Sequence, residues 1–264
     1  MREAGAWTED KLWVWNRYIE ITTSAMVGNP KWKGGLAYVD LFGGSGVCKV
    51  AGRRIPGSIL LAAMAPKQFS KIIVCEKKRS LANACEQRLT HFGAAGVSNV
   101  LIGDCNRLID DVVACIPSQS LSLAFIDPEG LHAEFNTVAK LTSGRQADLL
   151  ILFGDKMDIA RNVDLYAGQK ESKLDRFMGL DCPWRNEWLA LNSQDADLVC
   201  QLFVKLYKAQ LETKLGYKAF ADQVMRSSKS AIYRVIFATK HPRGEEFWKK
   251  ISKIDRQGQR SLFD

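Results

Sequence analysis

The middle of the chain carries five short, mostly apolar runs, separated by stretches with helical periodicity. The apolar runs lie at 37–42, 71–75, 99–102, 121–126 and 148–153. The helical stretches lie at 58–65, 80–92, 107–115 and 134–141. Strands that are apolar on both faces are typical of a parallel sheet covered by helices on each side. The pattern therefore predicts a doubly wound α/β domain, and Ser58 is the expected N-cap of the first helix after the sheet begins.

The alternation of apolar runs and helical stretches ends after residue 153. Residues 154–194 are polar and aromatic, which indicates short helices inserted beside the sheet, and residues 195–215 show the leucine spacing of one long helix. Two β-rich runs, 217–225 and 231–239, are joined by a short polar segment and predict a hairpin. A mostly parallel sheet that ends in an antiparallel hairpin resembles the Rossmann-like fold of class I methyltransferases. We expect one domain over 1–264, with an N-terminal helical extension over 1–36.

Charge is unevenly distributed along the chain. Residues 1–198 hold 23 basic and 23 acidic side chains, whereas residues 199–264 hold 14 basic and 6 acidic ones and so carry the whole net charge of +8. A basic C-terminal region favours an anionic partner, nucleic acid above all, although a solvated basic face explains the same numbers.

Seven cysteines are scattered through the sequence without a C-x-x-C pair. That spacing indicates neither a disulfide framework nor a zinc site. No run of about 18 apolar residues is present, so no membrane helix is expected. The N-terminus lacks the pattern of a signal peptide. These features together predict a cytoplasmic protein.

A glycine-rich turn follows the first apolar run, from Asp40 to Gly46. Glycines let the backbone turn sharply and approach a ligand at the carboxyl end of a parallel strand. The P-loop signature is missing because Val47 and Cys48 follow Gly46. A dinucleotide fold would begin its helix at once, whereas here a long basic loop precedes the helix. A nucleotide-like cofactor without a pyrophosphate fits better.

Acids close the next three apolar runs. Glu76 could accept hydrogen bonds from both hydroxyls of a ribose, and Asp104 from an adenine amino group. Asp127 ends the fourth run, in Asp127-Pro128-Glu129-Gly130. Acids also simply begin helices, so helix capping is the alternative for each.

Several motifs together resemble the bacterial three-Cys-motif partner proteins. The matching segments are Trp7-Thr8-x-x-Lys11-Leu12, Tyr38-x-Asp40-Leu41-Phe42-x-Gly44-x-Gly46, Gly57-Ser58, Phe125-Ile126-Asp127-Pro128-x-Gly130-Leu131, Asp148 to Phe153 and Phe237-Ala238-Thr239-Lys240-His241-Pro242. The resemblance implies a methyltransferase-like fold that binds S-adenosylmethionine (SAM), and a possible protein partner with the three-Cys motif. The candidate cofactor-binding residues are Asp40, Phe42, Gly43, Gly44, Ser45, Gly46, Glu76, Asp104 and Cys105.

Asp127, Pro128 and Glu129 are the candidate catalytic residues. Enzymes that methylate amino groups of DNA and RNA end this strand in Asp/Asn-Pro-Pro-aromatic, where the acid holds the amino group and the aromatic ring stacks on the base. Here Glu129 and Gly130 stand in place of proline and the aromatic residue, and the resembled family also carries an aromatic at the position of Glu129. Glu129 is a candidate general base. The alternative is a turn without catalytic function.

Three functions remain open from the sequence. The first is a SAM-dependent methyltransferase acting on nucleic acid, with phosphate contacts from Arg53, Arg54, Lys240, His241 and Arg243. The second is a non-catalytic adenosine-binding or nucleic-acid-binding subunit that works with a three-Cys-motif protein. The third is a metal-dependent, nuclease-like enzyme whose ion would be held by Asp127, Glu129, His132 and Glu134.

Overall fold

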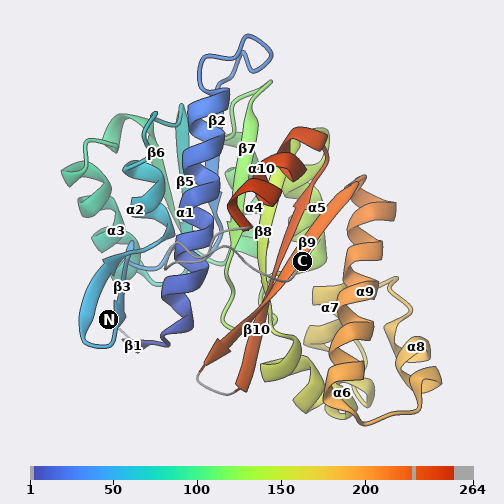
Figure 1. Ribbon diagram of the computed structural model, residues 1–264. Coiled ribbons are helices and arrows are strands. Elements are labelled where there is room, and N and C mark those ends of the chain that lie inside the picture. Colours follow the sequence, from blue (N-terminus) through green and yellow to red (C-terminus); the bar gives the residue numbers. More distant parts are fainter. Residues whose placement is uncertain (1–2, 228–229, 253–264) are drawn as a thin grey trace.

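Seven strands form one sheet in the order β6-β5-β2-β7-β8-β10-β9 (Figure 1). The computed structural model describes residues 3–227 and 230–252. The sheet strands are β2 (Leu36–Asp40), β5 (Lys71–Glu76), β6 (Ser98–Ile102), β7 (Leu121–Ile126), β8 (Gln146–Phe153), β9 (Ala219–Ser227) and β10 (Ser230–Thr239). The first five are parallel, and β10 pairs antiparallel with both β8 and β9. The predicted Rossmann-like sheet of the class I methyltransferase type, ending in a hairpin, is confirmed.

Helices cover both faces of this sheet. One face packs against α1 (Trp7–Met26), α2 (Ser58–Ala63), α3 (Arg79–His91) and α10 (Pro242–Ser252). The other packs against α4 (Cys105–Ala114), α5 (Phe135–Thr142), α7 (Lys173–Met178) and α9 (Ala196–Leu215). Alternate residues of β2 serve the two layers, since Tyr38 belongs to one core and Val39 to the other. Strands that are apolar on both faces produce this two-sided core.

The boundaries expected from the sequence differ from the observed ones by a few residues at most. One capping prediction is wrong. The helix α2 has Gly57 as its N-cap, without a side-chain hydrogen bond, and Ser58 is its first residue. The Ser58 hydroxyl instead donates to Asp40 at 2.5 Å, because the buried carboxylate is the stronger acceptor nearby.

A second, smaller sheet replaces the basic loop that we expected between Gly46 and the first helix. Its strands are β1 (Glu3–Ala4), β3 (Val47–Val50) and β4 (Arg53–Pro56). The hairpin of β3 and β4 turns at Ala51 and Gly52, whose φ angles of 48° and 77° are both positive, as a tight two-residue hairpin requires. β1 pairs with β3, which brings the start of the chain beside the glycine-rich turn.

The insertion after β8 is helical, as predicted. It contains the π-helical turn η2 (Asp155–Ile159), α6 (Ala160–Ala167), α7 and α8 (Trp184–Leu191). The carboxylate of Asp175 accepts hydrogen bonds from Ser172, Trp184 and Arg185, and so ties these helices together. The short 3-10 turn η1 (Ala95–Val97) precedes β6. Within the residues described, no helix has the length and apolar character to cross a membrane.

Candidate active site

The order of the strands reverses between β2 and β7. From β2 the chain moves outward to β5 and β6, and then crosses back to place β7 on the other side of β2. Open α/β sheets bind ligands outside the carboxyl ends of the strands at such a switch point. Asp40, the last residue of β2, lies in register with Phe125 of β7, two residues before Asp127. The sheet therefore brings Asp40 and Asp127 close together at the carboxyl edge of neighbouring strands.

The glycine-rich turn after β2 is held by β5. Gly43 donates its amide to the carbonyl of Cys75 at 2.9 Å, and a Cβ at Gly43 would lie 2.3 Å from a Val74 methyl group, so close packing requires glycine there. Gly44 donates its amide to Glu76 Oε2 at 2.8 Å. A Cβ placed on Gly44 would meet nothing within 4 Å, so the backbone borders open space at this point of the turn.

The other predicted residues of the turn have structural partners. Ser45 donates its hydroxyl to Val47, and its carbonyl accepts from Arg88 at 2.6 Å. Phe42 donates its amide to Asp40 and packs against the core. Gly46 accepts a backbone hydrogen bond from Gly57 at 2.8 Å. These contacts fix the shape of the turn.

Asp40 is fully buried, and both its oxygens accept hydrogen bonds, one from Ser58 and one from Phe42. Burial raises the pKa of this carboxyl to about 7, although the Ser58 and Phe42 hydrogen bonds oppose the rise. With no accessible surface, the Asp40 side chain supports the turn from beneath rather than offering an oxygen to a ligand.

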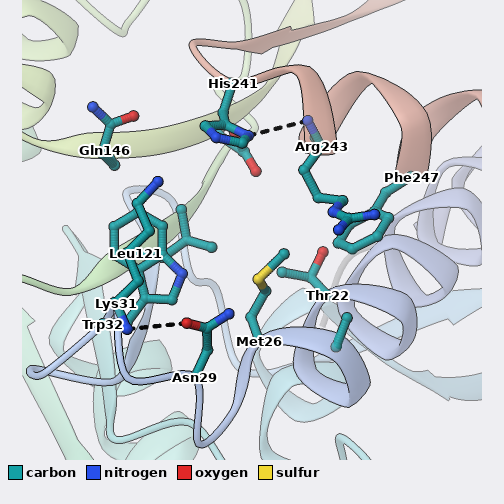
Figure 2. A pocket seen from close by; sticks show the side chains of 13 residues that line it. Thr22, Met26, Asn29, Lys31, Trp32, Leu121, Gln146, His241, Arg243 and Phe247 are labelled. Atoms are coloured by element: carbon teal, nitrogen blue, oxygen red, sulfur yellow. Dashed lines mark hydrogen bonds between the residues drawn. The ribbon is translucent and has the colours of Figure 1, made fainter.

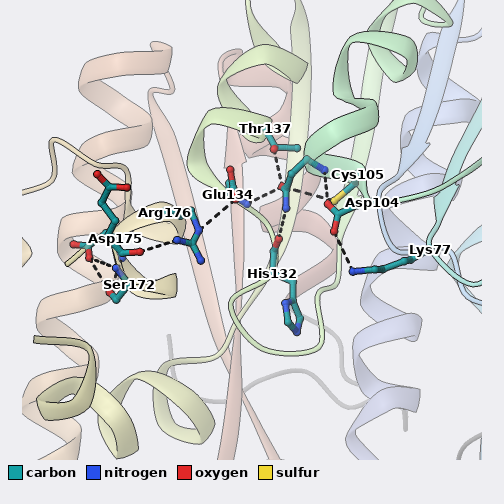
Figure 3. Close-up of polar contacts among 11 residues, drawn as sticks. Lys77, Asp104, Cys105, His132, Glu134, Thr137, Ser172, Asp175 and Arg176 are labelled. Carbon is teal, nitrogen blue, oxygen red and sulfur yellow. Dashed lines mark hydrogen bonds and ion pairs between the residues drawn. The ribbon is translucent and has the colours of Figure 1, made fainter. Parts of the chain in front are cut away.

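Glu76 and Asp104 end neighbouring strands (Figure 3 shows Asp104). Glu76 accepts from the amides of Gly44 and Lys78, one on each oxygen, and it keeps 9% of its surface exposed. Asp104 caps α4 through the amide of Asn106 and lies 3.3 Å from Lys77 Nζ, so the helix-capping alternative holds for this residue in part. Cys105 packs into the core, and burial raises the pKa of its thiol to about 12.

Lys11 of α1 forms an ion pair with Asp127, a contact that the sequence analysis missed. The Lys11 side chain is 5% exposed and that of Asp127 is 25% exposed. Lys11 Nζ also lies 4.8 Å from the ring centroid of Trp7 and 5.6 Å from that of Phe125. The only sequence signal was the opening motif Trp7-Thr8-x-x-Lys11, whose spacing puts Trp7 and Lys11 on one helical face.

Two aromatic side chains, Trp7 and Tyr233, lie next to this ion pair at the end of the sheet. The rings of Trp7 and Tyr233 lie 4.9 Å apart, and a Cβ on Gly154, just after β8, would lie 4.0 Å from the Tyr233 ring. The same Cβ would lie 3.6 Å from Asp158, and one on Gly130 would lie 2.9 Å from Asp158 Oδ2. The ends of β7 and β8 are thus bordered by a cation, two aromatic rings and a second carboxylate.

Gly130 occupies the position where amino-methylating enzymes carry an aromatic residue. Its φ is +83°, and the carboxylate of Asp158 fills the space that a side chain would need. Asp158 is itself held by Tyr166 at 2.5 Å and by Asn162. Local packing therefore requires glycine here, and the nearby rings come from α1 and β10 instead.

The four residues considered for a metal ion separate in the structure. Asp127 turns to Lys11, while Glu134 lies 3.4 Å from Arg176 of α7 (Figure 3). His132 is exposed, and its carbonyl accepts from Asn106. Glu129 is exposed and Pro128 is buried. In the part of the chain that the structure describes, no group of three His, Cys, Asp or Glu side chains is arranged to hold a metal.

The predicted phosphate contacts fall at opposite edges of the sheet. Arg53 pairs with Glu9 at 2.8 Å near the start of α1, and Arg54 is exposed on β4, whose partner strand β3 follows the glycine-rich turn. Lys240, His241 and Arg243 follow β10, which runs antiparallel, so they lie where the parallel strands begin. Lys240 donates to the carbonyls of Thr142 and Arg145, consistent with this placement.

Much of the basic C-terminal region is neutralised locally. Its pairs include Lys208 with Asp222, Lys214 with Asp181, Arg234 with Asp155 and Asp222, and Lys249 with Glu245. Residues 228–229 and 253–264 of this region lie outside the described residues. The excess of +8 therefore does not form one continuous basic stripe over the described part of 199–264.

The strand order and the helices on both faces of the sheet define the Rossmann-like, class I methyltransferase fold. No protein-family model matches the sequence. No curated protein matches it either. Among solved structures, protein LPL1258 from Legionella pneumophila str. Philadelphia 1 has a TM-score of 0.53 at 10% identity, over 96% of this chain and 95% of that one.

Two methyltransferase structures are also similar to this chain. The O-methyltransferase TomG from Streptomyces achromogenes, solved in complex with SAM, has a TM-score of 0.46 at 10% identity, over 86% of this chain and 79% of TomG. A SAM-dependent O-methyltransferase from Thermotoga maritima has a TM-score of 0.41 at 12% identity, over 85% of this chain and 64% of that one. Sequence identities this low indicate similarity of fold and nothing about function.

Proposed function

We propose that this protein is a SAM-dependent methyltransferase. The observation that carries the proposal is the convergence at the β2/β7 switch point: the Gly44 turn is tied to Glu76, and Asp127 lies at the same carboxyl edge of the sheet. The open space beside Gly44, the 9% of its surface that Glu76 keeps exposed and the partly exposed side chain of Asp104 suit an adenosine.

In this proposal the cofactor lies across the ends of β2, β5 and β6. Glu76 accepts hydrogen bonds from the ribose hydroxyls with the lone pairs that the Gly44 and Lys78 amides leave free. Asp104 takes the adenine amino group. SAM supplies an activated methyl group when bound, and the protein supplies position and exclusion of water.

Asp127 is the residue that orients the methyl acceptor. Lys11 binds Asp127 Oδ2, which leaves Oδ1 to accept a hydrogen bond from an amino or hydroxyl group of the acceptor. Lys11 keeps the carboxylate in one orientation at a partly buried position. Lys11 is therefore a positioning residue that acts through Asp127.

Nucleic acid is the acceptor that we favour. The rings of Trp7 and Tyr233 lie near the ion pair of Lys11 and Asp127, where they could contact a planar base whose amino group reaches Asp127. Arg53 and Arg54, at the same edge, would contact its phosphates. All seven cysteines are free thiols, which fits the reducing cytoplasm that we predict.

Cofactor binding is tested by thermal and denaturant unfolding with SAM. At one hundred times its dissociation constant, SAM should stabilise the fold by about 2.7 kcal/mol. Glu76→Ala should abolish the shift, whereas Glu86→Ala, an exposed acid on α3, should leave it unchanged. A wild type without any shift contradicts the cofactor proposal.

Methyl transfer is tested by incubating the protein with methyl-labelled SAM and total RNA, DNA or protein, and by measuring the label incorporated into each. Asp127→Asn should lower the incorporation at least a hundredfold, whereas Asp110→Asn, an exposed acid on α4, should not. Binding of nucleic acid should weaken steeply with salt, and a flat response excludes that acceptor. If SAM binds and no methyl group is transferred, the second candidate holds, a non-catalytic subunit acting with a three-Cys-motif protein.

A further inference from the structure

A cavity of about 360 Å³ lies at the edge of the sheet opposite the candidate active site (Figure 2). It sits between the end of α1, the loop that follows it, the first residues of β7 and β8, and the start of α10. Its lining includes Thr22, Met26, Trp32, Leu121, Arg243 and Phe247.

The cavity is separate from the proposed methyl-transfer site. Leu121 begins β7, and Asp127 follows its last residue. A strand rises about 3.3 Å per residue, so six steps separate the two positions by roughly 20 Å. A ligand in the cavity therefore cannot occupy the methyl-transfer site, and the function of the cavity must be sought in its own lining.

The walls combine an apolar body with unpartnered polar atoms. Leu121 and Phe247 are buried and apolar, and Met26 and Trp32 are half-buried. Among the described residues, the buried indole Nε1 of Trp32 makes no hydrogen bond, and the buried Oγ1 of Thr22 has only the Tyr18 hydroxyl as a polar neighbour. Thr22 lies beside the Tyr18 hydroxyl, which already donates to Asp148. A buried N–H without a partner destabilises the protein, and an acceptor oxygen on a ligand would satisfy it.

The rim is positively charged. Lys31, His241 and Arg243 are exposed around the opening. The His241 Nδ1 accepts from the amide of Arg243 at 3.1 Å (Figure 2), so Nε2 carries the hydrogen and is a donor. The first turn of α10 adds the positive end of a helix dipole.

Two acids also lie near the cavity. Asp148 lines it, but its oxygens are engaged by Tyr18 at 2.7 Å and Thr239 at 2.5 Å. Glu246 lies 3.2 Å from Arg243, and both side chains are more than half exposed, so water screens this pair. Two cations, Lys31 and Arg243, and the neutral Nε2–H donor of His241 therefore remain at the rim.

We propose that this cavity binds a small aromatic anion. The ring would occupy the apolar space between Met26, Trp32 and Phe247. One acceptor oxygen would meet the Trp32 indole N–H, and a carboxylate, phosphate or sulfonate would lie against Lys31 and Arg243. The volume is within the range of small-molecule sites.

A pair of fluorescent probes tests the proposal on the full chain. The aromatic sulfonate 8-anilino-1-naphthalenesulfonate should bind one to one, and Arg243→Gln or Lys31→Gln should weaken its binding about five- to tenfold. The uncharged analogue N-phenyl-1-naphthylamine should bind more weakly and respond to neither substitution. Met26→Trp, which fills the cavity, should lower the affinity for both probes at least tenfold.

Lys250→Gln is the matched control, because it removes one exposed positive charge from α10 outside the cavity. Its affinity for the sulfonate should equal that of the wild type. Thermal midpoints of all variants check that each is folded. Absence of saturable binding overturns the proposal, as does equal weakening by Lys250→Gln and Arg243→Gln, or unchanged binding in Met26→Trp.

Discussion

Lys11 on the first turns of α1 is paired with Asp127 at the end of β7, 116 residues later in the chain. The pair connects the N-terminal helix to the carboxyl edge of the sheet at its switch point. The positive charge of Lys11 also opposes the rise in the pKa of Asp40 that burial causes. The same cation therefore stabilises the charged form of both carboxylates at this edge of the sheet. The extension before the sheet is therefore part of the candidate active site.

Lys11→Met should destabilise the fold by about 2–3 kcal/mol, because it leaves the carboxylate of Asp127 without its counter-ion at a partly buried position. Urea unfolding measures the loss. Lys77→Met is the control: its partner Asp104 lies 3.3 Å away in an exposed pair, and the expected change is within about 0.5 kcal/mol. Equal effects of the two substitutions would show that the Lys11 pair contributes no more than a surface contact.

Gly130→Ala should cost more stability than Gly28→Ala. Both glycines have φ near +80°, but Gly28 has nothing within 4 Å of an added Cβ, whereas Gly130 faces Asp158 at 2.9 Å. We expect about 1 kcal/mol for Gly28→Ala and about 2–3 kcal/mol for Gly130→Ala. In an Asp158→Ala background the cost of Gly130→Ala should fall to that of Gly28→Ala. If it does not fall, the contact with Asp158 is not the cause.

Asp148→Asn should flatten the dependence of stability on pH between about 4 and 6. Burial raises the pKa of Asp148 to about 6 in the folded protein, above its unfolded value, so the folded state holds the proton more tightly. The wild type therefore loses stability as pH rises through this window, on the order of 3 kcal/mol from this group. Denaturant unfolding at several pH values measures the slope. An unchanged slope in Asp148→Asn would contradict the assignment.

Ser58→Ala should lower the free energy of unfolding more at pH 8 than at pH 6. The Ser58 hydroxyl donates to Asp40, whose pKa is about 7, so the lost hydrogen bond matters most when the carboxylate is ionised. The expected difference between the two pH values is about 1 kcal/mol in the free energy of unfolding. Ser45→Ala is the control, since that hydroxyl donates to the neutral carbonyl of Val47 and should cost the same at both values.

The sequence determined the sheet and the edge at which we propose that the cofactor binds. Continuous apolar strands such as 121–126 and amphipathic helices between them leave few alternatives, because local period and burial agree. The order of acids after successive strands, Glu76, Asp104 and Asp127, follows from the same topology. What local patterns could not supply was the partner of each acid.

Only the tertiary structure decided which side chains meet. Lys11 and Asp127 are distant in sequence, and nothing in the local pattern of α1 distinguishes a lysine that turns inward from one that faces solvent. The same holds for Gly130, whose neighbour Asp158 belongs to the inserted helices. The antiparallel direction of β10 placed Lys240, His241 and Arg243 at the far edge of the sheet, where His241 and Arg243 border a cavity remote from the proposed methyl-transfer site. Periodicity reports burial along one element, whereas a site is a set of contacts between elements.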